Sequence, residues 1–545
     1  MKKFLTLLLI TSHALLFAQT EADIDALFQL EPGSPGAVVG IFETGGIRFA
    51  KGYGLANLDY DIPITTKTVF DIGSVSKQFT AACIFLLEQQ QRLSIDDPIQ
   101  MYLPEIPVYH GETVRIRHLI NHTSGLRDYV ELMAYEGTPY ENLFTEDQGL
   151  EMMARQKDRN FPPGTQFMYN NGGYLLLAII VRRVSGMSIG AVAQKNIFDP
   201  LGMKHTFILE NPARVVKNSA TGYAKNEAGV YEKQHYYNFA LGGDGQVYTT
   251  LEDLLLWDNN FYGQKVGGQA LHDRMHEQAV LNNGQKIDYA GGLFIQTHKG
   301  EKMVQHSGSW GGFRSLFFRF PDRKVSLVIL TNAPDVLAFG NVYPLLDKVL
   351  SKDDTHNLSP LELSTVNVPT KKLIPFTGTY EAIKQPQLRW SVTLENDTLR
   401  VTQAWNELSF QILPISSSEF FRKDVPDIRF SFLADASGPL IRDRLEDVQT
   451  RKTDPYLDDP STALSKFTGT FFSTETNTQY TLSVQDKLLV LQRGKDFTTT
   501  LQRVSQLVFR NKMQGFQFVE NENGIQGFFI QDRRIRNLWF ERVKS

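Results

Sequence analysis

The chain has 545 residues, of which 42% are hydrophobic and 21% are charged, and its formal net charge is −4. This length exceeds what one hydrophobic core organises, and the composition excludes a chain that is disordered throughout. A small negative charge gives no long-range attraction to nucleic acid or anionic lipid, so neither is an expected partner and the function has to be sought in a localised site.

The first residues are typical of a secretion signal. Lys2 and Lys3 precede a short, mostly apolar stretch over residues 4–17, and Ala18 is the small residue expected at a cleavage site. We therefore expect residues 1–18 to be a signal peptide and the protein to be exported, to the periplasm or outside the cell. No later stretch has the eighteen or more apolar residues of a membrane helix, so no membrane span is expected.

The single cysteine, Cys83, excludes an intramolecular disulfide and a cysteine-rich zinc site. It lies within the apolar run 81–87, which is typical of a small core residue. No metal and no cofactor are expected.

Residues 19–352 carry the patterns of one mixed α+β domain. Strand patterns occupy residues 37–42, 47–50, 291–297, 303–307, 313–320 and 325–331, and helical patterns occupy residues 113–120, 174–184 and 250–259, with a further helix after Ser74. Because strands lie at both ends with helices between them, we expect the terminal segments to share one sheet.

The C-terminal third reads as a linker followed by a duplication. Residues 353–370 are polar and interrupted by proline, which is linker composition. The sequence at 376–380 then recurs at 467–471, and each copy has short alternating strands separated by turn residues. We expect two small antiparallel β-barrel-like domains, at residues 371–453 and 460–545.

The first element that carries chemistry is Ser74-Val75-Ser76-Lys77, the only Ser-x-x-Lys in the chain. The helical pattern that follows places Ser74 at a helix N-terminus, where backbone N–H groups favour a developing negative charge. Residues three apart share a helix face, so the Lys77 amine can reach the Ser74 hydroxyl and serve as its base. Alone, the pattern also fits a capping serine beside a solvated lysine.

The second element is a tyrosine with an asparagine two residues later. Three pairs fit: Tyr140 with Asn142, Tyr169 with Asn171, and Tyr236 with Asn238. We favour Tyr169 because it lies in a loop just before a buried helical pattern, from which it can project into a cleft. Its phenol could pass a proton to a leaving group, and the Asn171 amide could orient a substrate carbonyl.

The third element is His-x-Gly, at His298-Lys299-Gly300 and at His306-Ser307-Gly308. The first copy reads as the tip of a hairpin. The second ends an apolar strand, and Gly308 lets the backbone approach a ligand closely. We expect the N–H of Ser309 to pair with that of Ser74 as an oxyanion hole.

Together and in this order, the three elements resemble the penicillin-recognising serine hydrolases related to class C β-lactamases, D-alanyl-D-alanine carboxypeptidases, D-aminopeptidases and some esterases. The likeness extends from about Gly36 to Asn332. It implies a multidomain α+β protein in which a β-lactamase/transpeptidase-like catalytic domain precedes the two β-domains. That catalytic domain consists of an antiparallel sheet with helices and a helical subdomain. It also implies an acyl-enzyme on Ser74.

One departure bears on the substrate. Family β-lactamases typically carry Lys-Thr-Gly where this chain has His306-Ser307-Gly308, and an imidazole holds a carboxylate less well than that lysine does. The histidine form is similar to that of certain carboxypeptidases and aminopeptidases, so we expect a peptidase or amidase directed at D-amino acids. The alternatives are an esterase or weak β-lactamase of this fold, and a non-catalytic protein that binds cell-wall fragments.

The expected substrate is a small peptide, amide or ester, and peptidoglycan is one source of such compounds. A carboxypeptidase would need a cation near His306, and Arg314 is the first that follows it in sequence. An aminopeptidase would need an acidic group, which the sequence does not locate. Two β-domains behind the catalytic domain also resemble the D-aminopeptidase architecture, in which a barrel loop can enter the active site. Gly186-Met187-Ser188-Ile189-Gly190 fits the nucleophile elbow of α/β-hydrolases, but the preceding pattern is helical where that motif needs a strand.

Overall fold

The computed structural model describes residues 22–544 apart from short internal segments, which are residues 235–237, 337–341, 351–364, 384, 405–406, 424, 433–438, 443–446, 454–462, 512–513 and 533. The expected signal peptide lies outside the described residues. Of the expected linker, only residues 365–370 are described, so both assignments stay predictions.

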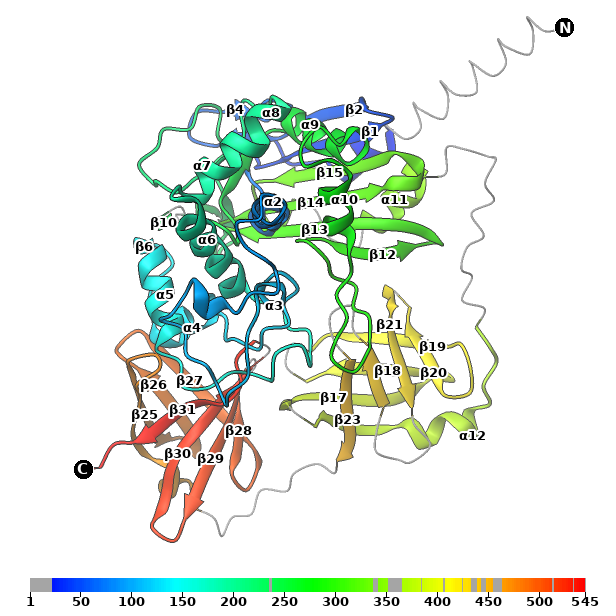
Figure 1. The fold of residues 1–545 in the computed structure, drawn as a ribbon. Helices are drawn as coiled ribbons and strands as arrows, with labels where there is room; N and C mark the ends of the chain where they lie inside the picture. Colours follow the sequence, from blue (N-terminus) through cyan, green and yellow to red (C-terminus); the bar gives the residue numbers. More distant parts are fainter. Residues whose placement is uncertain are drawn as a thin grey trace, which may run out of the picture.

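One antiparallel sheet joins the two ends of the N-terminal part (Figure 1), with six strands in the order β12-β13-β14-β15-β1-β2. The strands are β1 (Ala37–Glu43), β2 (Gly46–Tyr53), β12 (Phe294–His298), β13 (Glu301–Trp310), β14 (Phe313–Phe320) and β15 (Val325–Thr331). Strand β15 is buried along its whole length, which explains its continuous run of apolar and β-branched residues. Because β1 pairs with β15, the expectation of a sheet shared by the terminal segments is confirmed.

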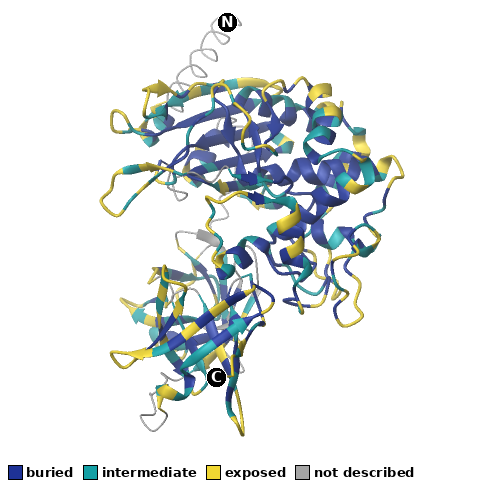
Figure 2. Ribbon diagram, turned by 90° about the vertical axis from the view of Figure 1, so that its left-hand side faces the viewer, coloured by how far each residue is buried: buried dark blue, intermediate teal, exposed yellow. Residues whose placement is uncertain are grey.

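Helices pack beside this sheet around two members that are buried along most of their length, α2 and α6, and Figure 2 shows this region as mostly buried. The helices are α2 (Lys77–Gln89), α3 (Ile116–Ile120), α4 (Tyr129–Glu136), α5 (Glu146–Ala154), α6 (Asn171–Ser185), α7 (Ile189–Ala193), α8 (Asp199–Leu201), α9 (Leu251–Gly263), α10 (Gly268–His276) and α11 (Val342–Leu350). Among the described residues, no single helix has the length and apolar character needed to cross a membrane.

The helix predictions hold for α6 and α9 and fail in part for α3. Thr250 caps α9 as expected, since its hydroxyl accepts the Asp253 N–H at 3.2 Å. The predicted helix from residue 113 begins only at Ile116. Val114 remains extended because its carbonyl accepts the N–H of Ile99 from a neighbouring loop.

Short strands complete the sheet edges and loops around the helices. They are β3 (Leu55–Asn57), β4 (Ile62–Pro63), β5 (Phe70–Asp71), β6 (Phe144–Thr145), β7 (Phe207–Ile208), β8 (Tyr223–Lys225), β9 (Tyr231–Lys233), β10 (Phe239–Ala240) and β11 (Val247–Thr249). Of these, β11 lies between β5 and β7 in a small sheet, and the loop just before β11 reaches the nucleophile helix.

Two closed barrels of eight strands each follow, after a short helix α12 (Thr370–Leu373). The first contains β16 (Gly378–Ala382), β17 (Gln385–Glu395), β18 (Thr398–Gln403), β19 (Ser409–Pro414), β20 (Glu419–Arg422), β21 (Val425–Phe432), β22 (Pro439–Arg442) and β23 (Asp447–Thr453). The second contains β24 (Gly469–Ser473), β25 (Thr478–Gln485), β26 (Leu488–Arg493), β27 (Phe497–Ser505), β28 (Val508–Arg510), β29 (Gly515–Asn521), β30 (Gly524–Gln531) and β31 (Leu538–Arg542). The exact domain boundaries proposed from the sequence stay predictions.

The second barrel docks on the helical part of the molecule next to α4 (Figure 1). The guanidinium of Arg127 lies buried at the centre of this contact, between the barrel and the helical part. Arg127 forms an ion pair with Glu475, donates to Gln156 Oε1 at 2.8 Å, and donates to the carbonyls of Arg536 and Asn537 at 3.1 and 2.8 Å. The barrel is therefore attached by a buried, fully bonded charge.

Replacing Glu475 by alanine should destabilise the protein by about 3–5 kcal/mol, because Arg127 would stay buried without its counter-charge. The matched control is Glu520→Ala in the same barrel, which removes an exposed pair with Lys466 (3.0 Å) and should cost about 1 kcal/mol or less. Both effects can be read from thermal and urea midpoints, and equal small shifts for the two variants would contradict this account.

Candidate active site

The nucleophile turn lies where helix α2 meets strand β13. Ser74 belongs to a 3₁₀ turn, η1 (Gly73–Ser76), that leads directly into α2. Gly73 has φ +49°, and a Cβ there would lie 2.8 Å from the Ser309 nitrogen. A Cβ on Gly308 would lie 2.0 Å from the Ile72 carbonyl oxygen. Only glycines permit this approach, which brings the backbone of Ser309 beside the nucleophile.

Lys77 is fully buried directly beneath Ser74. Its amine donates to Ser74 Oγ at 3.1 Å, to Asn171 Oδ1 at 2.9 Å and to the backbone carbonyl of Asp244 at 2.6 Å. Among the described residues, no carboxylate forms an ion pair with it. When the amine is neutral, two N–H bonds can hold the Asn171 and Asp244 oxygens, so its lone pair faces the Ser74 hydroxyl.

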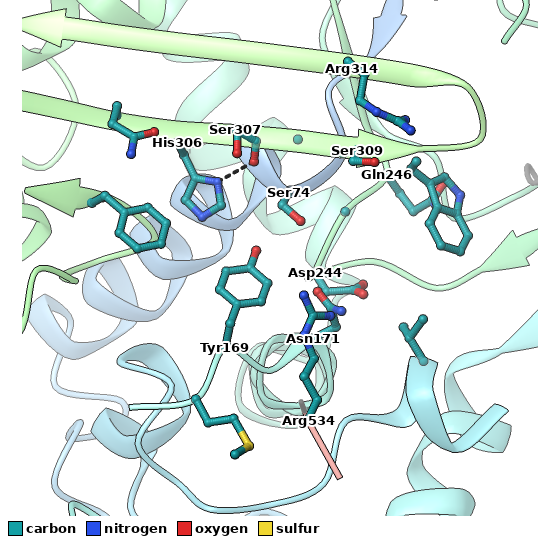
Figure 3. Close-up of a pocket in the computed structure, with 18 of the residues that line it drawn as sticks. Ser74, Tyr169, Asn171, Asp244, Gln246, His306, Ser307, Ser309, Arg314 and Arg534 are labelled. Atoms are coloured by element: carbon teal, nitrogen blue, oxygen red, sulfur yellow. Dashed lines mark hydrogen bonds between the residues drawn. The ribbon is translucent and has the colours of Figure 1, made fainter. Parts of the chain in front are cut away.

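Tyr169 projects from its loop toward Ser74 (Figure 3). Its hydroxyl is buried and has no hydrogen-bond partner in the described part of the chain, and the Lys77 amine lies 4.9 Å from its ring centre. The competing Tyr140 packs its ring against Trp310, and Tyr236 lies outside the described residues. The free phenol is thus available to a ligand.

Asn171 begins helix α6, and hydrogen bonds to Asp128 fix its orientation. The backbone N–H and the side-chain Nδ2 of Asn171 both donate to Asp128 Oδ2, at 2.9 and 3.0 Å. These bonds turn the Asn171 oxygen toward Lys77. The structure therefore uses this amide to orient the lysine, and its contact with a substrate carbonyl stays a prediction.

His306 lies in the cavity as a neutral imidazole. Its Nδ1 donates to the Ser307 carbonyl at 2.7 Å, and its Nε2 accepts the Tyr289 hydroxyl at 3.2 Å. Burial, reinforced by the charge of Lys77, lowers the pKa of His306 to about 3. The other His-x-Gly histidine, His298, contacts Asp347 at 2.7 Å and does not line the cavity.

The end of strand β13 offers its backbone to a ligand. Strand β12 pairs with β13 only as far as Gln305, so β12 does not cover residues 306–310. Ser307, Gly308 and Ser309 all line a cavity of about 670 Å³ that opens over Ser74. An N–H from Ser309 and one from Ser74 can therefore converge on one oxygen atom, as expected for an oxyanion hole.

Asp244 and Gln246 also line the cavity and were not identified from the sequence. Asp244 accepts the Tyr129 hydroxyl at 3.0 Å, and burial raises its pKa to about 6. Gln246 is buried with φ +68°, and its Oε1 has no partner among the described residues. Both lie in the run Gly242-Gly243-Asp244-Gly245-Gln246, whose glycines were the available signal.

The second barrel contributes to the cavity wall. Arg534, in the connection from β30 to β31, lines the cavity with its guanidinium 5.3 Å from the Tyr169 ring centre. It lies 3.6 Å from both Asp128 and Glu131. Docking of the barrel packs this connection against the helical part, where Asn160 bonds the Arg534 carbonyl and the Arg536 N–H.

The predicted site residues converge on this cavity, which Figure 3 shows with Ser74 at its centre. Tyr169 and His306 lie on one side of Ser74, and Asp244, Gln246 and Arg314 lie on the other. Arg314 is close to His306 in sequence, but in the cavity the two side chains lie on opposite sides of Ser74. Within the described residues, no group of His, Cys, Asp and Glu side chains is arranged to hold a metal ion.

Comparison with known families matches residues 17–347 to the family described as Beta-lactamase. Penicillin-binding protein 4* of Bacillus subtilis is 30% identical over 427 residues, which are 73% of this chain and 90% of that protein. A D-aminopeptidase of Gluconobacter oxydans is 27% identical over 316 residues, which are 58% of this chain and only 59% of the relative.

Solved structures share the fold. The octameric penicillin-binding protein homologue from Pyrococcus abyssi aligns with a TM-score of 0.55 and 22% identity, over 88% of this chain and 98% of that one. The D-amino acid amidase from Ochrobactrum anthropi SV3, complexed with L-phenylalanine amide, aligns with a TM-score of 0.51 and 22% identity, over 61% of this chain and 98% of that one.

Asp71→Asn should make stability less dependent on pH. Asp71 is buried and accepts the Gly73 N–H at 2.8 Å, and burial raises its pKa from 3.8 to about 7. A raised pKa means that the stabilisation is complete below about pH 4 and is lost as the pH rises through about 7. The Tm of Asp71→Asn relative to the wild type should therefore rise by about 5 °C or more between pH 4 and pH 8. The exposed control Asp322→Asn should show no such trend, and a flat difference for Asp71→Asn would refute the assignment.

Arg534→Ala should lower kcat/KM by about tenfold to a hundredfold, because Tyr169 loses the guanidinium that packs on its ring and the cavity loses part of its wall. Arg534→Lys keeps the charge and should retain more activity. Lys495→Ala, in an exposed turn of the same barrel, should have no effect. Unchanged kinetics in Arg534→Ala would show that the barrel does not shape the site.

Proposed function

This chain belongs to the Beta-lactamase family, and from that premise we propose that it is a serine hydrolase that forms an acyl-enzyme on Ser74 and cleaves amide bonds of D-amino-acid substrates. The observation that carries the proposal is the 3.1 Å contact between the Lys77 amine and Ser74 Oγ. Serine is a weak nucleophile unless a neighbouring base takes its proton, and this contact supplies the base.

The chemistry follows from the geometry. The neutral Lys77 amine accepts the Ser74 proton as Oγ bonds to the substrate carbonyl carbon, and the N–H groups of Ser74 and Ser309 hold the resulting oxyanion. The C–N bond then breaks as the Tyr169 phenol gives its proton to the departing nitrogen, and Lys77 returns a proton to Tyr169. A water molecule then attacks the acyl carbonyl carbon as Tyr169 takes its proton and passes its own to Lys77, and the bond to Ser74 Oγ breaks as Lys77 returns a proton to that oxygen.

Substrate direction follows from the position of Tyr169. Because the phenol protonates the leaving group, the leaving group lies on the side of Tyr169 and His306, and the acyl group lies on the opposite side. Carboxypeptidase and β-lactam substrates carry a carboxylate on the leaving side, where the imidazole of His306 is neutral. The Asp244 carboxylate, on the acyl side, suits the ammonium group of an N-terminal residue. We therefore favour an aminopeptidase or amidase of D-amino-acid derivatives.

The alternative functions fit the site less well. A β-lactamase needs a cation for the drug carboxylate, but the cation beside Tyr169, Arg534, already lies against Asp128 and Glu131, and an esterase would not need the acid at Asp244. A non-catalytic binding protein has no need for the buried Lys77 or for the unbonded Tyr169 hydroxyl.

The proposal includes export of the protein. It is supported by the charged and apolar pattern of residues 1–18. In the periplasm or outside the cell, peptides derived from peptidoglycan are a source of D-amino-acid amide bonds, and we propose them as the natural substrate class.

The test is hydrolysis of D-alanyl p-nitroanilide, L-alanyl p-nitroanilide, N-acetyl-D-Ala-D-Ala and a chromogenic cephalosporin. The D-alanyl anilide should exceed the two carboxylate substrates in kcat/KM by about a hundredfold or more, since on the leaving side His306 is neutral and Arg534 is already paired with Asp128 and Glu131. Ser74→Ala should lower turnover at least about a thousandfold and abolish labelling by a fluorescent acylating probe.

The control is Ser188→Ala, which removes the serine of the competing elbow motif. Ser188 caps helix α7 and contacts Glu210 at 2.7 Å, so its loss should affect stability but leave labelling intact. Turnover that survives in Ser74→Ala would refute the serine mechanism, and a preference for N-acetyl-D-Ala-D-Ala would identify a carboxypeptidase instead.

A further inference from the structure

The acyl side of the cavity contains a cation without a counter-charge, Arg314. It lines the cavity, and its printed hydrogen bond joins Nη1 to the carbonyl of its own neighbour Phe313, at 2.7 Å. Among the described residues, no Asp or Glu lies within ion-pair distance of it. Burial alone lowers the pKa of Arg314, without a contribution from any neighbouring charge. A guanidinium nonetheless stays charged at neutral pH.

Two arginines that the fold buries completely are each paired with an acid. Arg127 is paired with Glu475, and Arg319 with Asp258 at 2.7 Å. Partial burial of a charge is costly unless an opposite charge compensates it. Arg314 therefore differs from these structural arginines, and its missing partner is to be sought in a ligand.

The register of the sheet places Arg314 close to the reacting carbonyl. Arg314 stands directly opposite Ser309, so the two side chains share one face of the sheet. Ser309 provides an N–H to the proposed oxyanion hole. Since Arg314 lies on the opposite side of Ser74 from His306 (Figure 3), it can reach a group on the acyl residue but not one on the leaving group.

Gln246 is a second, independent sign of a ligand on this side. Gln246 is only 4% exposed and its Oε1 has no partner in the described part of the chain, whereas buried polar atoms in proteins are as a rule hydrogen-bonded. Its left-handed backbone, φ +68°, is strained for a residue other than glycine and is typical of functional positions. Figure 3 shows Gln246 and Arg314 on the same side of the cavity.

Asp244 cannot be the missing partner of Arg314. Its carboxylate accepts the Tyr129 hydroxyl at 3.0 Å, and it forms no ion pair with Arg314. The acyl side thus presents an acid and, separately, an unpaired cation. An amino acid whose ammonium group meets Asp244 and whose side chain is anionic satisfies both.

We propose that Arg314, with Gln246 beside it, binds the side-chain carboxylate of an acidic acyl residue, so that the preferred substrates are amides or peptides that begin with an acidic amino acid. This inference rests on the proposed function for the orientation of the substrate. It goes further in naming the class of acyl residue and the residue that selects it.

Binding tests the proposal independently of turnover. In the full chain carrying Ser74→Ala, calorimetry would compare glutamate with glutamine, in both D and L forms, because the two differ in side-chain charge at nearly equal size. For the enantiomer that binds, glutamate should bind about tenfold tighter or more. Adding Arg314→Gln should bring the ratio near one, and Arg314→Lys, which guards against misfolding, should retain part of it.

The matched control is Lys302→Gln, which removes one positive charge from the exposed start of β13, outside the cavity, and should leave the ratio unchanged. A ratio near one before mutation, no binding of either glutamate, or a ratio that survives Arg314→Gln would overturn the proposal. If the wild type hydrolyses D-alanyl p-nitroanilide but the Ser74→Ala chain binds glutamate no tighter than glutamine, this inference alone is refuted. A glutamate preference without any hydrolysis refutes the proposed function alone.

Discussion

The site depends on one buried amine. Lys77 brings together the nucleophile turn, the start of helix α6 and the loop before β11, because its amine contacts the Ser74 hydroxyl, the Asn171 side-chain oxygen and the Asp244 backbone carbonyl. These oxygens are all neutral, so the lysine is held by geometry without an ion pair. The same three contacts aim the amine at Ser74 Oγ, which makes the arrangement both a structural anchor and a base.

This anchor is supported by the second barrel. Asp128 holds Asn171 in place, and Arg534 of the barrel lies 3.6 Å from Asp128, while the neighbouring Arg127 is buried against Glu475. A chain of contacts therefore connects the barrel to Lys77 through Asp128 and Asn171. The duplication in the sequence supplied two barrels, but only the second contributes a described residue to the cavity wall.

Charge is distributed unequally about Ser74. On the leaving side, His306 is neutral because burial and Lys77 oppose its protonation. On the acyl side, Asp244 and Arg314 offer one acid and one cation that are not paired with each other. This asymmetry distinguishes the site from one built for substrates with a carboxylate on the leaving group, and it directs attention to the chemistry of the acyl residue.

The sequence by itself determined the elements of local chemistry. Ser74 and Lys77 could be recognised because a spacing of three on a helix dictates their contact, and Gly308 because a close approach demands glycine. The hairpin, the long buried helices and the strands of the two barrels could be predicted from the spacing of apolar residues along the chain, which is also a local property. The family resemblance rested on these same short motifs.

Only the tertiary structure decided which distant side chains share the cavity. Arg534 is separated from Tyr169 by hundreds of residues, and no local pattern reports that a docked barrel places them together. Arg314 is close to His306 in sequence, yet it lies across Ser74 from it, since the turn after β13 carries the chain to the other side. The burial that makes His306 neutral is likewise a property of packing that no single segment contains, and so is the lack of an ion pair to Arg314 among the described residues.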